Sequence, residues 1–390
     1  MIREAGARPA PGGVVHDRTV QNLTDPTGAW DLVVGRDDLA STAFPDAIVP
    51  AAGDGEVVLR VDRVGVTANN VTYALVGDSM HYWDFFPAEP GWGRVPLWGF
   101  ADVIDSQADG VAAGTRVYGY LPPSSHLVVR PDRISDAGFR DSSDHRQPLP
   151  APYNVYSTTT GDPAYDADRE DLQVLYRPLF MTSFMLDDFL ADSAVDGRAF
   201  FGAEALLLSS ASSKTAYGAA FCTGLRADRP RLIGLTSAAN RDFTESLGCY
   251  DEVLTYDDVE TLPTDRPTVY VDMAGAVPLR RRVHLHLGDA LVHDAVVGAT
   301  HLDAPPAGAS GMPGPAPQFF FAPSQMSKRR EDWGPGGIES RFGESWRAFV
   351  PVVEGWVDVD ERHGRDGLRD AWLEVLSGTA DPRRGHVVQL

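Results

Sequence analysis

Cysteine and long apolar runs are scarce in this 390-residue chain. Its two cysteines, Cys222 and Cys249, are too few for a disulfide framework or a cysteine-rich zinc site, and they favour a reducing compartment. No run approaches the ~18 apolar residues of a membrane span, and the polar start of the chain, broken by prolines, carries no recognisable secretory signal. We therefore expect a cytoplasmic protein.

Positive charge is also in short supply. The chain has 34 lysines and arginines against 55 acidic residues, which gives a net charge of −21. This excess of acid argues against bulk attraction to nucleic acid or to an anionic membrane. Hydrophobic residues make up 43% and charged residues 23%, the balance of a globular protein, and the length favours two lobes.

Lysine occurs only twice, as Lys214 and Lys328. Lys214 belongs to the stretch Ser-Ser-Ala-Ser-Ser-Lys-Thr at 209–215, which follows an apolar run at 205–208 and leads into a helix-like segment. A tight loop between a buried strand and a helix start is a usual phosphate site, although its glycines are missing here. The alternatives are a surface lysine beside a serine N-cap, or a lost cofactor site. The loop residues that we expect to bind phosphate are Ser210, Ser212, Ser213, Lys214 and Thr215.

The first part of the chain predicts a β-rich lobe, because short apolar strands alternate with turns. We expect these strands at 56–64, 99–106, 115–120 and 127–129. Residues 136–165 are rich in Asp, Ser, Pro and Thr and are interpreted as a long surface connection, followed by a helix over 170–191.

The second part alternates strands and helices, which predicts a parallel sheet covered on both faces. The expected strands are 205–208, 231–235, 252–255, 269–272 and 291–298. The expected helices are 215–224, 240–247 and 277–287. A loop over 303–318, two helices near 338–356 and 368–377, and an extended tail at 386–390 complete the chain.

The order of several motifs resembles the medium-chain dehydrogenase/reductases. Residues 58–66 resemble the opening strand of that superfamily, 114–120 its G-x-R-V strand, and 247–256 its L-G-A-D-E-V-I-D-Y segment. The resemblance, to a divergent branch of poorly defined function, implies an α/β fold in three parts. These are a GroES-like catalytic lobe over 1–165, a Rossmann-type doubly wound parallel sheet over 166–325, and a return segment over 326–390 that packs on the first lobe. It also implies a homodimer through an edge strand at 291–300.

Two departures from the superfamily concern zinc. Thr67 occupies the position of a zinc-ligating cysteine, and Gly99-Phe100-Ala101 replaces the G-H-E motif. The resemblance therefore implies a zinc-free enzyme, in which hydrogen bonds polarise the substrate carbonyl.

The expected cofactor is NADPH. An NAD site usually has an acidic residue after the second strand of the sheet, whereas this chain has hydroxyls, an amide and a guanidinium, which suit a 2′-phosphate. These residues are Thr236, Ser237, Asn240 and Arg241, of which Ser237 and Asn240 have the alternative role of capping a helix. Further expected cofactor positions are Ala274, Gly298, Phe321 and Lys328. The basic run 328–330 is expected to reach the pyrophosphate or an acid group of the substrate, or else to be an exposed surface.

The expected catalytic residues lie after the first long strand and in an aromatic insertion, and they are Asn70, Tyr73, His81 and Tyr82. A phenol such as Tyr73 can donate a proton or stabilise a developing enolate, or it can be a wall residue. Asn70 and His81 have structural alternatives as a turn cap and a packed ring. The expected substrate-binding residues are Trp83, Phe86, Trp98 and Thr182.

Together these features predict an NADPH-dependent, zinc-independent reductase of an apolar or aromatic α,β-unsaturated carbonyl. Two alternatives remain open: a zinc-free ketone reductase, and a cofactor-free relative that uses the cleft for binding or non-redox chemistry.

Overall fold

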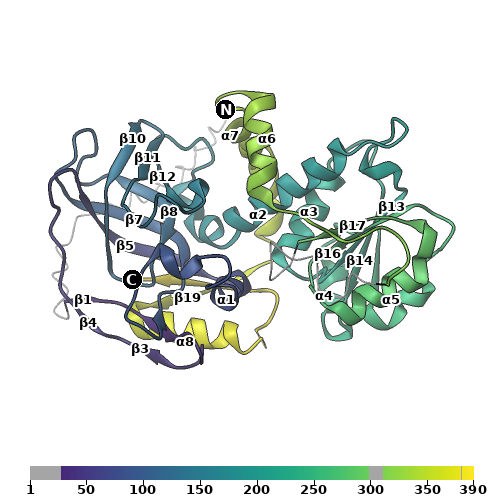
Figure 1. Ribbon diagram of the computed structural model, residues 1–390, viewed down its shortest axis with the longest axis horizontal. Helices are drawn as coiled ribbons and strands as arrows, with labels where there is room; N and C mark the ends of the chain where they lie inside the picture. Colours follow the sequence, from purple (N-terminus) through teal and green to yellow (C-terminus); the bar gives the residue numbers. More distant parts are fainter. Residues whose placement is uncertain (1–27, 298–310, 379) are drawn as a thin grey trace, which may run out of the picture.

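The computed structural model describes residues 28–297, 311–378 and 380–390 and has two lobes with the long helix α2 (Glu170–Asp192) between them (Figure 1). The first lobe is built on a nine-stranded sheet in the order β10-β11-β12-β8-β7-β5-β20-β19, with β9 also paired to β5. Its strands are β5 (Val57–Val66), β7 (Leu97–Ser106), β8 (Arg116–Leu121), β9 (His126–Val129), β10 (Pro131–Ser135), β11 (Gly138–Asp141), β12 (Val155–Thr158), β19 (Asp358–His363) and β20 (Arg384–Gln389).

Smaller elements surround this sheet. They are β1 (Ala29–Trp30), β2 (Val33–Gly35), β3 (Thr42–Ala43), β4 (Asp46–Ala47), β6 (Trp92–Gly93), helix α1 (Ala68–Leu75) and the short 3-10 helix η1 (Tyr82–Phe85). The four strands predicted in this lobe are confirmed. One prediction is wrong: the segment 136–165 is not a surface connection, because it contributes β11 and β12 to the sheet. The two strands are only four residues long, and the polar sequence around them hides them.

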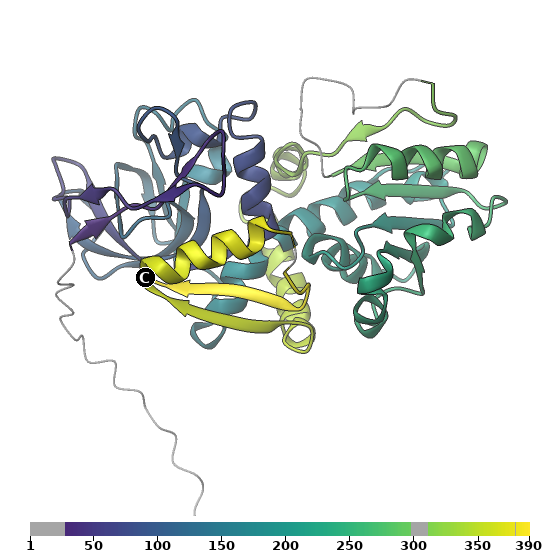
Figure 2. The same ribbon diagram turned by 90° about the horizontal axis from the view of Figure 1, so that it is seen from below.

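The end of the chain returns to the first lobe. The predicted extended tail is strand β20, which pairs antiparallel with β5 and parallel with β19. Helix α8 (Gly364–Leu376) lies beside these strands, as Figure 2 shows in yellow. The two helices before them, α6 (Ala322–Trp333) and α7 (Gly337–Val353), pack instead on α2.

The second lobe is a six-stranded parallel sheet in the order β15-β14-β13-β16-β17-β18, the doubly wound arrangement that the alternating pattern predicted. Its elements are β13 (Ala205–Ser209), α3 (Lys214–Gly224), β14 (Arg231–Thr236), α4 (Arg241–Ser246), β15 (Glu252–Thr255), β16 (Thr268–Asp272), α5 (Val277–Leu287), β17 (Leu291–Val296) and β18 (Gln318–Phe319). Leu206 and Leu208 of β13 pack against α2 and α3, whereas Leu207 packs against α5. Alternation along one strand thus buries both faces of the sheet.

The strand expected to form the edge of this sheet is an interior strand. β17 pairs with β16 on one side and with β18 on the other. Within the described ranges, β18 pairs only with Ala295 and Val296 of β17, and the pairing of two subunits through this strand stays a prediction. Gly298 and the rest of the predicted strand lie outside the described residues.

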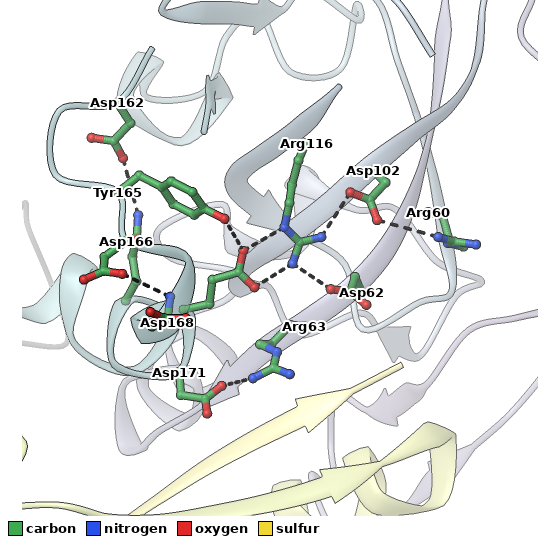
Figure 3. A network of polar contacts seen from close by, with 12 residues as sticks. Arg60, Asp62, Arg63, Asp102, Arg116, Asp162, Tyr165, Asp166, Asp168 and Asp171 are labelled. Atoms are coloured by element: carbon green, nitrogen blue, oxygen red, sulfur yellow. Dashed lines mark hydrogen bonds and ion pairs between the residues drawn. The ribbon is translucent and has the colours of Figure 1, made fainter. Parts of the chain in front are cut away.

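A partly buried ion-pair network joins α2 to the first sheet (Figure 3). Arg116, the arginine of the G-x-R-V motif, donates from Nε to Glu170 of α2 at 2.7 Å, and from its Nη atoms to Asp62 at 2.7 Å and Asp102 at 3.0 Å. Tyr165 Oη donates to the same glutamate at 2.9 Å. The motif arginine therefore fixes the start of the helix that lies between the two lobes.

Among the described residues, no helix is both long enough and apolar enough to span a lipid bilayer.

Candidate active site

A cavity of ≈770 Å³ lies between the two lobes. Both lobes, α2 and the last segment of the chain contribute to its lining. It opens at the carboxyl ends of the parallel strands, beside the switch point between β13 and β16 where doubly wound sheets bind ligands. The predicted residues that line it are Tyr73, Tyr82, Trp98, Thr182, Ser212, Ser213, Lys214, Thr215 and Phe321.

Tyr73, on α1, lies in the aromatic wall on the first-lobe side of the cavity. Its hydroxyl oxygen accepts a hydrogen bond from Trp98 Nε1 at 3.3 Å, and its ring lies 4.5 Å from that of Tyr82 and 5.6 Å from that of Tyr120. Burial raises the pKa of the Tyr73 phenol well above its usual value. The hydroxyl therefore keeps its proton at neutral pH and can donate a hydrogen bond, but it cannot act as a base.

Tyr82 forms the next part of the wall. Its hydroxyl shares a 3.2 Å hydrogen bond with that of Tyr153, and burial raises the pKa of both phenols. Tyr118, whose ring is stacked on Trp98, lines the same wall. Tyr153 was not predicted here because it lies in the segment interpreted as a surface connection. Tyr118 was not predicted because strand alternation alone does not tell which face borders a cavity.

Two predicted catalytic residues lie outside the cavity lining. Asn70 is buried in the cap of α1, where its Oδ1 accepts from Thr67 N at 2.7 Å and its Nδ2 donates to Pro96 O at 2.8 Å. His81 is exposed and contacts Asp84 at 2.9 Å. The geometry therefore favours the structural roles, a cap for Asn70 and a surface contact for His81. Of the two neighbouring asparagines, Asn69 lines the cavity.

Two predicted substrate-binding aromatics are core residues. Trp83 fills the space left by two glycines, since a Cβ on Gly77 or Gly93 would lie within 2.5 Å of its ring. Phe86 is buried, and the guanidinium carbon of Arg146 lies 5.0 Å from the centre of the Phe86 ring. Neither lines the cavity, so this prediction is wrong for both. Thr182 does line it, while its hydroxyl donates to Pro178 O at 3.3 Å.

The serine-lysine loop connects β13 to α3. Ser210 has φ +48°, a left-handed conformation that favours glycine, and Ser213 is the N-cap of α3, accepting from Ala216 N at 3.3 Å. The N–H groups of Lys214 and Thr215 stand at the first turn and have no partner within the helix. Because both residues line the cavity, this helix start is suited to an anion.

The Lys214 ammonium reaches across to the other lobe. Its Nζ donates to the carbonyl oxygens of Pro382 at 3.4 Å and Arg384 at 3.3 Å, and it lies 5.7 Å from the ring of Tyr176. Burial lowers the pKa of Lys214 to about 8, and Asp381 opposes this shift. The lysine thus links the loop to the segment that enters β20.

A buried network supports the loop from beneath. Ser209 Oγ donates to Asp272 at 3.1 Å and accepts from the backbone N–H of Ala274 at 3.1 Å. The buried Arg280 donates from Nε to the other oxygen of Asp272 at 2.8 Å. Ala274, a predicted cofactor residue, therefore helps to join the ends of β13 and β16 and does not line the cavity.

The predicted 2′-phosphate residues surround the end of β14, next to the loop but outside the cavity lining. Ser212 Oγ accepts from Asn240 Nδ2 at 3.1 Å and from Thr236 Oγ1 at 3.5 Å. Ser237 is half-buried. Arg241 is exposed and pairs with Glu245 at 2.8 Å. Thr236 is buried, so the polar surface that continues from the loop is formed by Ser237, Asn240 and Arg241.

Lys328 lies away from the cavity lining, because its ammonium pairs with Asp192 at 2.9 Å and Asp332 at 2.7 Å. Of the basic run 328–330, only Arg330 lines the cavity. The predicted contact of Lys328 with a cofactor is therefore wrong.

One cluster of metal-type ligands is found in the described part of the chain, formed by Asp360, Glu374 and His386. Arg362 pairs with both carboxylates, at 2.8 and 2.5 Å. The acidic charge of the cluster is thus already balanced by a guanidinium. At the superfamily's zinc position, Thr67 lines the cavity and Phe100 is buried.

The comparisons with known proteins identify a family and a fold. The profile of a family described as "Protein of unknown function (DUF2855)" matches residues 64–381. No curated protein matches the chain significantly by sequence.

Several solved structures have this fold. CurA from Vibrio vulnificus shares 15% identity with a TM-score of 0.58, covering 93% of this chain and 98% of its own. The same protein is also solved in complex with NADPH, at 13% identity and TM-score 0.58, covering 92% and 98%. A putative NADPH:quinone reductase from Bacillus thuringiensis shares 13% identity with a TM-score of 0.55, covering 93% and 99%. The predicted GroES-like lobe and Rossmann-type sheet are confirmed at the level of the fold.

Proposed function

The chain belongs to the DUF2855 family and has the fold of the medium-chain reductases, and from these premises we propose that it is an NADPH-dependent reductase of an apolar α,β-unsaturated carbonyl compound that works without zinc. One observation carries the proposal: a single cavity is lined both by the Tyr73–Trp98 wall and by the serine-lysine loop at the start of α3. A substrate-sized apolar surface and a phosphate-type site therefore meet in one space.

The loop fits the phosphates of a dinucleotide. Three kinds of donor are available to phosphate oxygens. They are the unpartnered N–H groups at the start of α3, the hydroxyls of Ser212 and Ser213, and the one N–H of the Lys214 ammonium that does not bond a carbonyl. The half-buried Ser237 and the exposed Arg241 beside the loop support a 2′-phosphate, and so NADPH over NADH. When bound, NADPH supplies a hydride to the β-carbon of the substrate.

The residues of the wall act on the substrate carbonyl. As the C=C bond is reduced, negative charge develops on the carbonyl oxygen, and the Tyr73 hydroxyl donates a hydrogen bond to it. The Trp98 N–H occupies an acceptor site of that hydroxyl, which leaves the Tyr73 proton free to be donated. Thr67 and Phe100 at the superfamily's zinc position support polarisation by hydrogen bonds and not by a metal.

A second candidate is a cofactor-free relative, favoured by the Lys214 hydrogen bonds to Pro382 and Arg384. In that case the lysine holds the lobes together and binds no phosphate. A third candidate, reduction of a ketone, uses the same Tyr73 contact.

The decisive experiment is a fluorescence titration of NADPH and NADH into the wild-type protein, with the two lysines as a matched pair. We expect Lys214→Ala to weaken NADPH binding by about tenfold or more, the scale of a charge-assisted hydrogen bond. Lys328→Ala, which removes an exposed ammonium away from the cavity lining, is expected to leave the affinity unchanged. If the wild-type protein binds no NADPH, the reductase proposal is wrong. If binding holds, turnover of an enone and of its saturated ketone separates the two reductions.

A further inference from the structure

Two arginines line the cavity and are not needed to hold a dinucleotide phosphate. Arg177, on α2, and Arg330, on α6, both line it. The proposed phosphate ligand Lys214 contacts Tyr176 and the carbonyls of 382 and 384. Arg177 and Arg330 have other neighbours and therefore belong to a different part of the lining.

Arg177 is held from behind as a fixed cation. Its Nη1 is hydrogen-bonded to Asp162, and its guanidinium carbon lies 4.9 Å from the centre of the Tyr118 ring and 6.0 Å from that of Phe342. Asp162 itself is almost buried and also accepts from Ala164 N at 2.9 Å. No acceptor for Nε or Nη2 of Arg177 is found among the described residues, and neither atom is sealed from solvent. The guanidinium therefore has donors to spare on a side chain that lines the cavity.

Arg177 is close to the proposed reaction centre through a chain of ring contacts. Tyr118 is stacked on Trp98 at 5.8 Å, and Trp98 donates to the Tyr73 hydroxyl at 3.3 Å. A ligand of one aromatic ring and a short side chain can thus contact the wall and Arg177 together.

Arg330 is the second cation. Its neighbours in the basic run are neutralised, Lys328 by Asp192 and Arg329 by Asp188 at 2.6 Å. Arg330 has no ion pair with any described residue and is exposed. It lies one helical turn from Met326, which also lines the cavity.

The charge balance of the cavity differs from that of the whole chain. Four basic residues line it (Arg177, Lys214, Arg330 and Arg384) against three acidic ones (Asp162, Glu339 and Asp381), whereas the chain has 34 basic and 55 acidic residues. Asp162 is paired with Arg177, and Arg384 is paired with Glu374 at 3.1 Å. The cavity lining thus lacks the excess of acid of the whole chain, and the spare donors of Arg177 are available to an anionic ligand there.

We propose that Arg177 binds a carboxylate on the substrate, with Arg330 adding positive charge to the same cavity, so that the substrate is an aromatic or apolar unsaturated carbonyl compound that carries an acid group. This inference rests on the proposed function for the reacting part of the substrate. Carboxylate binding itself requires neither NADPH nor turnover.

Calorimetric binding of cinnamate and of cinnamamide to the full chain without cofactor tests the site directly, because the two probes differ in the charged group. We expect cinnamate to bind about tenfold or more tightly, the scale of a hydrogen bond to a charged group. Arg177→Gln is expected to abolish this preference and leave cinnamamide binding unchanged. Arg330→Gln is expected to reduce the preference, and Arg281→Gln, which removes an exposed arginine of α5 outside the cavity lining, to retain it.

Arg177→Gln leaves Asp162 without its ion-pair partner. If this variant does not fold for that reason, Arg177→Lys and Arg330→Gln are used in its place. Equal affinities of the wild-type protein for the two probes overturn the proposal, as does an unchanged preference in both Arg177→Lys and Arg330→Gln. A protein that prefers cinnamate but binds no NADPH overturns the reductase proposal alone. With NADPH, benzalacetone and its 4-carboxylate form the matched substrate pair, and the same preference is expected in KM.

Discussion

The two walls of the cavity use their polar atoms in opposite ways. On the first lobe, two pairs of aromatic side chains share hydrogen bonds, Tyr82 with Tyr153 and Trp98 with Tyr73, while the buried Tyr118 hydroxyl has no partner among the described residues. Burial keeps these phenols protonated and neutral. The wall is therefore a rigid, uncharged surface with a single kind of chemistry to offer, hydrogen-bond donation.

On the second lobe, the loop is made of small side chains and one ammonium. Its helix N–H groups are unpartnered within the helix, and Lys214 donates to backbone carbonyls of the other lobe. The two walls of one cavity therefore differ in chemistry: the first-lobe wall is neutral and aromatic, whereas the loop on the second lobe is suited to bind an anion. Each lobe also has an arginine that is paired with carboxylates, the half-buried Arg116 in the first lobe and the buried Arg280 in the second.

The largest effect is expected from removing the arginine beneath the loop. Arg280→Met leaves the fully buried Asp272 without its guanidinium partner, and we expect a loss of about 3–5 kcal/mol in the free energy of unfolding. Arg116→Met is expected to cost less, because Asp62 and Asp102 are about a quarter exposed to water and the buried Glu170 keeps the Tyr165 hydroxyl as a donor. Urea unfolding of both variants measures this contrast, and an equal or reversed order would contradict it.

Removal of one hydroxyl tests the chemistry of the wall. We expect Tyr73→Phe to lower kcat by about 10²-fold, the low end of general acid catalysis. Tyr82→Phe is the matched control, since its hydroxyl is already paired with Tyr153, and a much smaller loss is expected. Steady-state kinetics with saturating NADPH and an enone measure both; equal losses would show that the wall, and not Tyr73 in particular, supports catalysis.

The charge of the loop is expected to depend on pH. Because the pKa of Lys214 is lowered to about 8, the free protein loses this charge as pH rises through 8, and NADPH binding must then take up a proton. We expect constant affinity between pH 7 and 7.5 and an approach to a tenfold loss per pH unit above about 8.5. Lys214→Arg stays charged in this range, so its affinity is expected to be flat. A flat profile for the wild-type protein would place the phosphates away from Lys214.

The smallest effect concerns the backbone of the loop. Ser210→Gly removes a left-handed non-glycine residue and is expected to stabilise the protein by up to about 1 kcal/mol, with little change in NADPH affinity. Thermal unfolding with an NADPH titration measures both. A large loss of affinity would instead give the Ser210 hydroxyl a direct part in binding.

Much of the fold could be predicted because strands and helices leave periodic patterns. The strand at 205–208 and the helix at 170–191 are recognisable from apolar spacing, and they are present as β13 and α2. The short strands β11 and β12 were missed because four polar-flanked residues carry no clear period, and they gain stability only from pairing with distant strands.

The candidate site was predicted in part. Residue type and motif order pointed to Tyr73, Trp98 and the loop; Tyr73, Trp98 and residues 212–215 of the loop line the cavity, whereas Ser210 does not. Asn70, His81, Trp83 and Phe86 were placed there by their neighbours in the sequence, yet the first two serve as a cap and an exposed partner of Asp84. The choice between Asn69 and Asn70 depends on the direction of a side chain on α1.

The two lobes, the parallel sheet and the position of a polar loop after its first strand can be predicted from the amino-acid sequence, because they follow from local patterns of burial. Which residues face one another across the cavity depends on how the two lobes pack together. Arg177, Tyr153 and the carbonyls of 382 and 384 are distant in sequence from the loop and the wall. Burial and charge at the site come from these long-range contacts, and no local pattern encodes them.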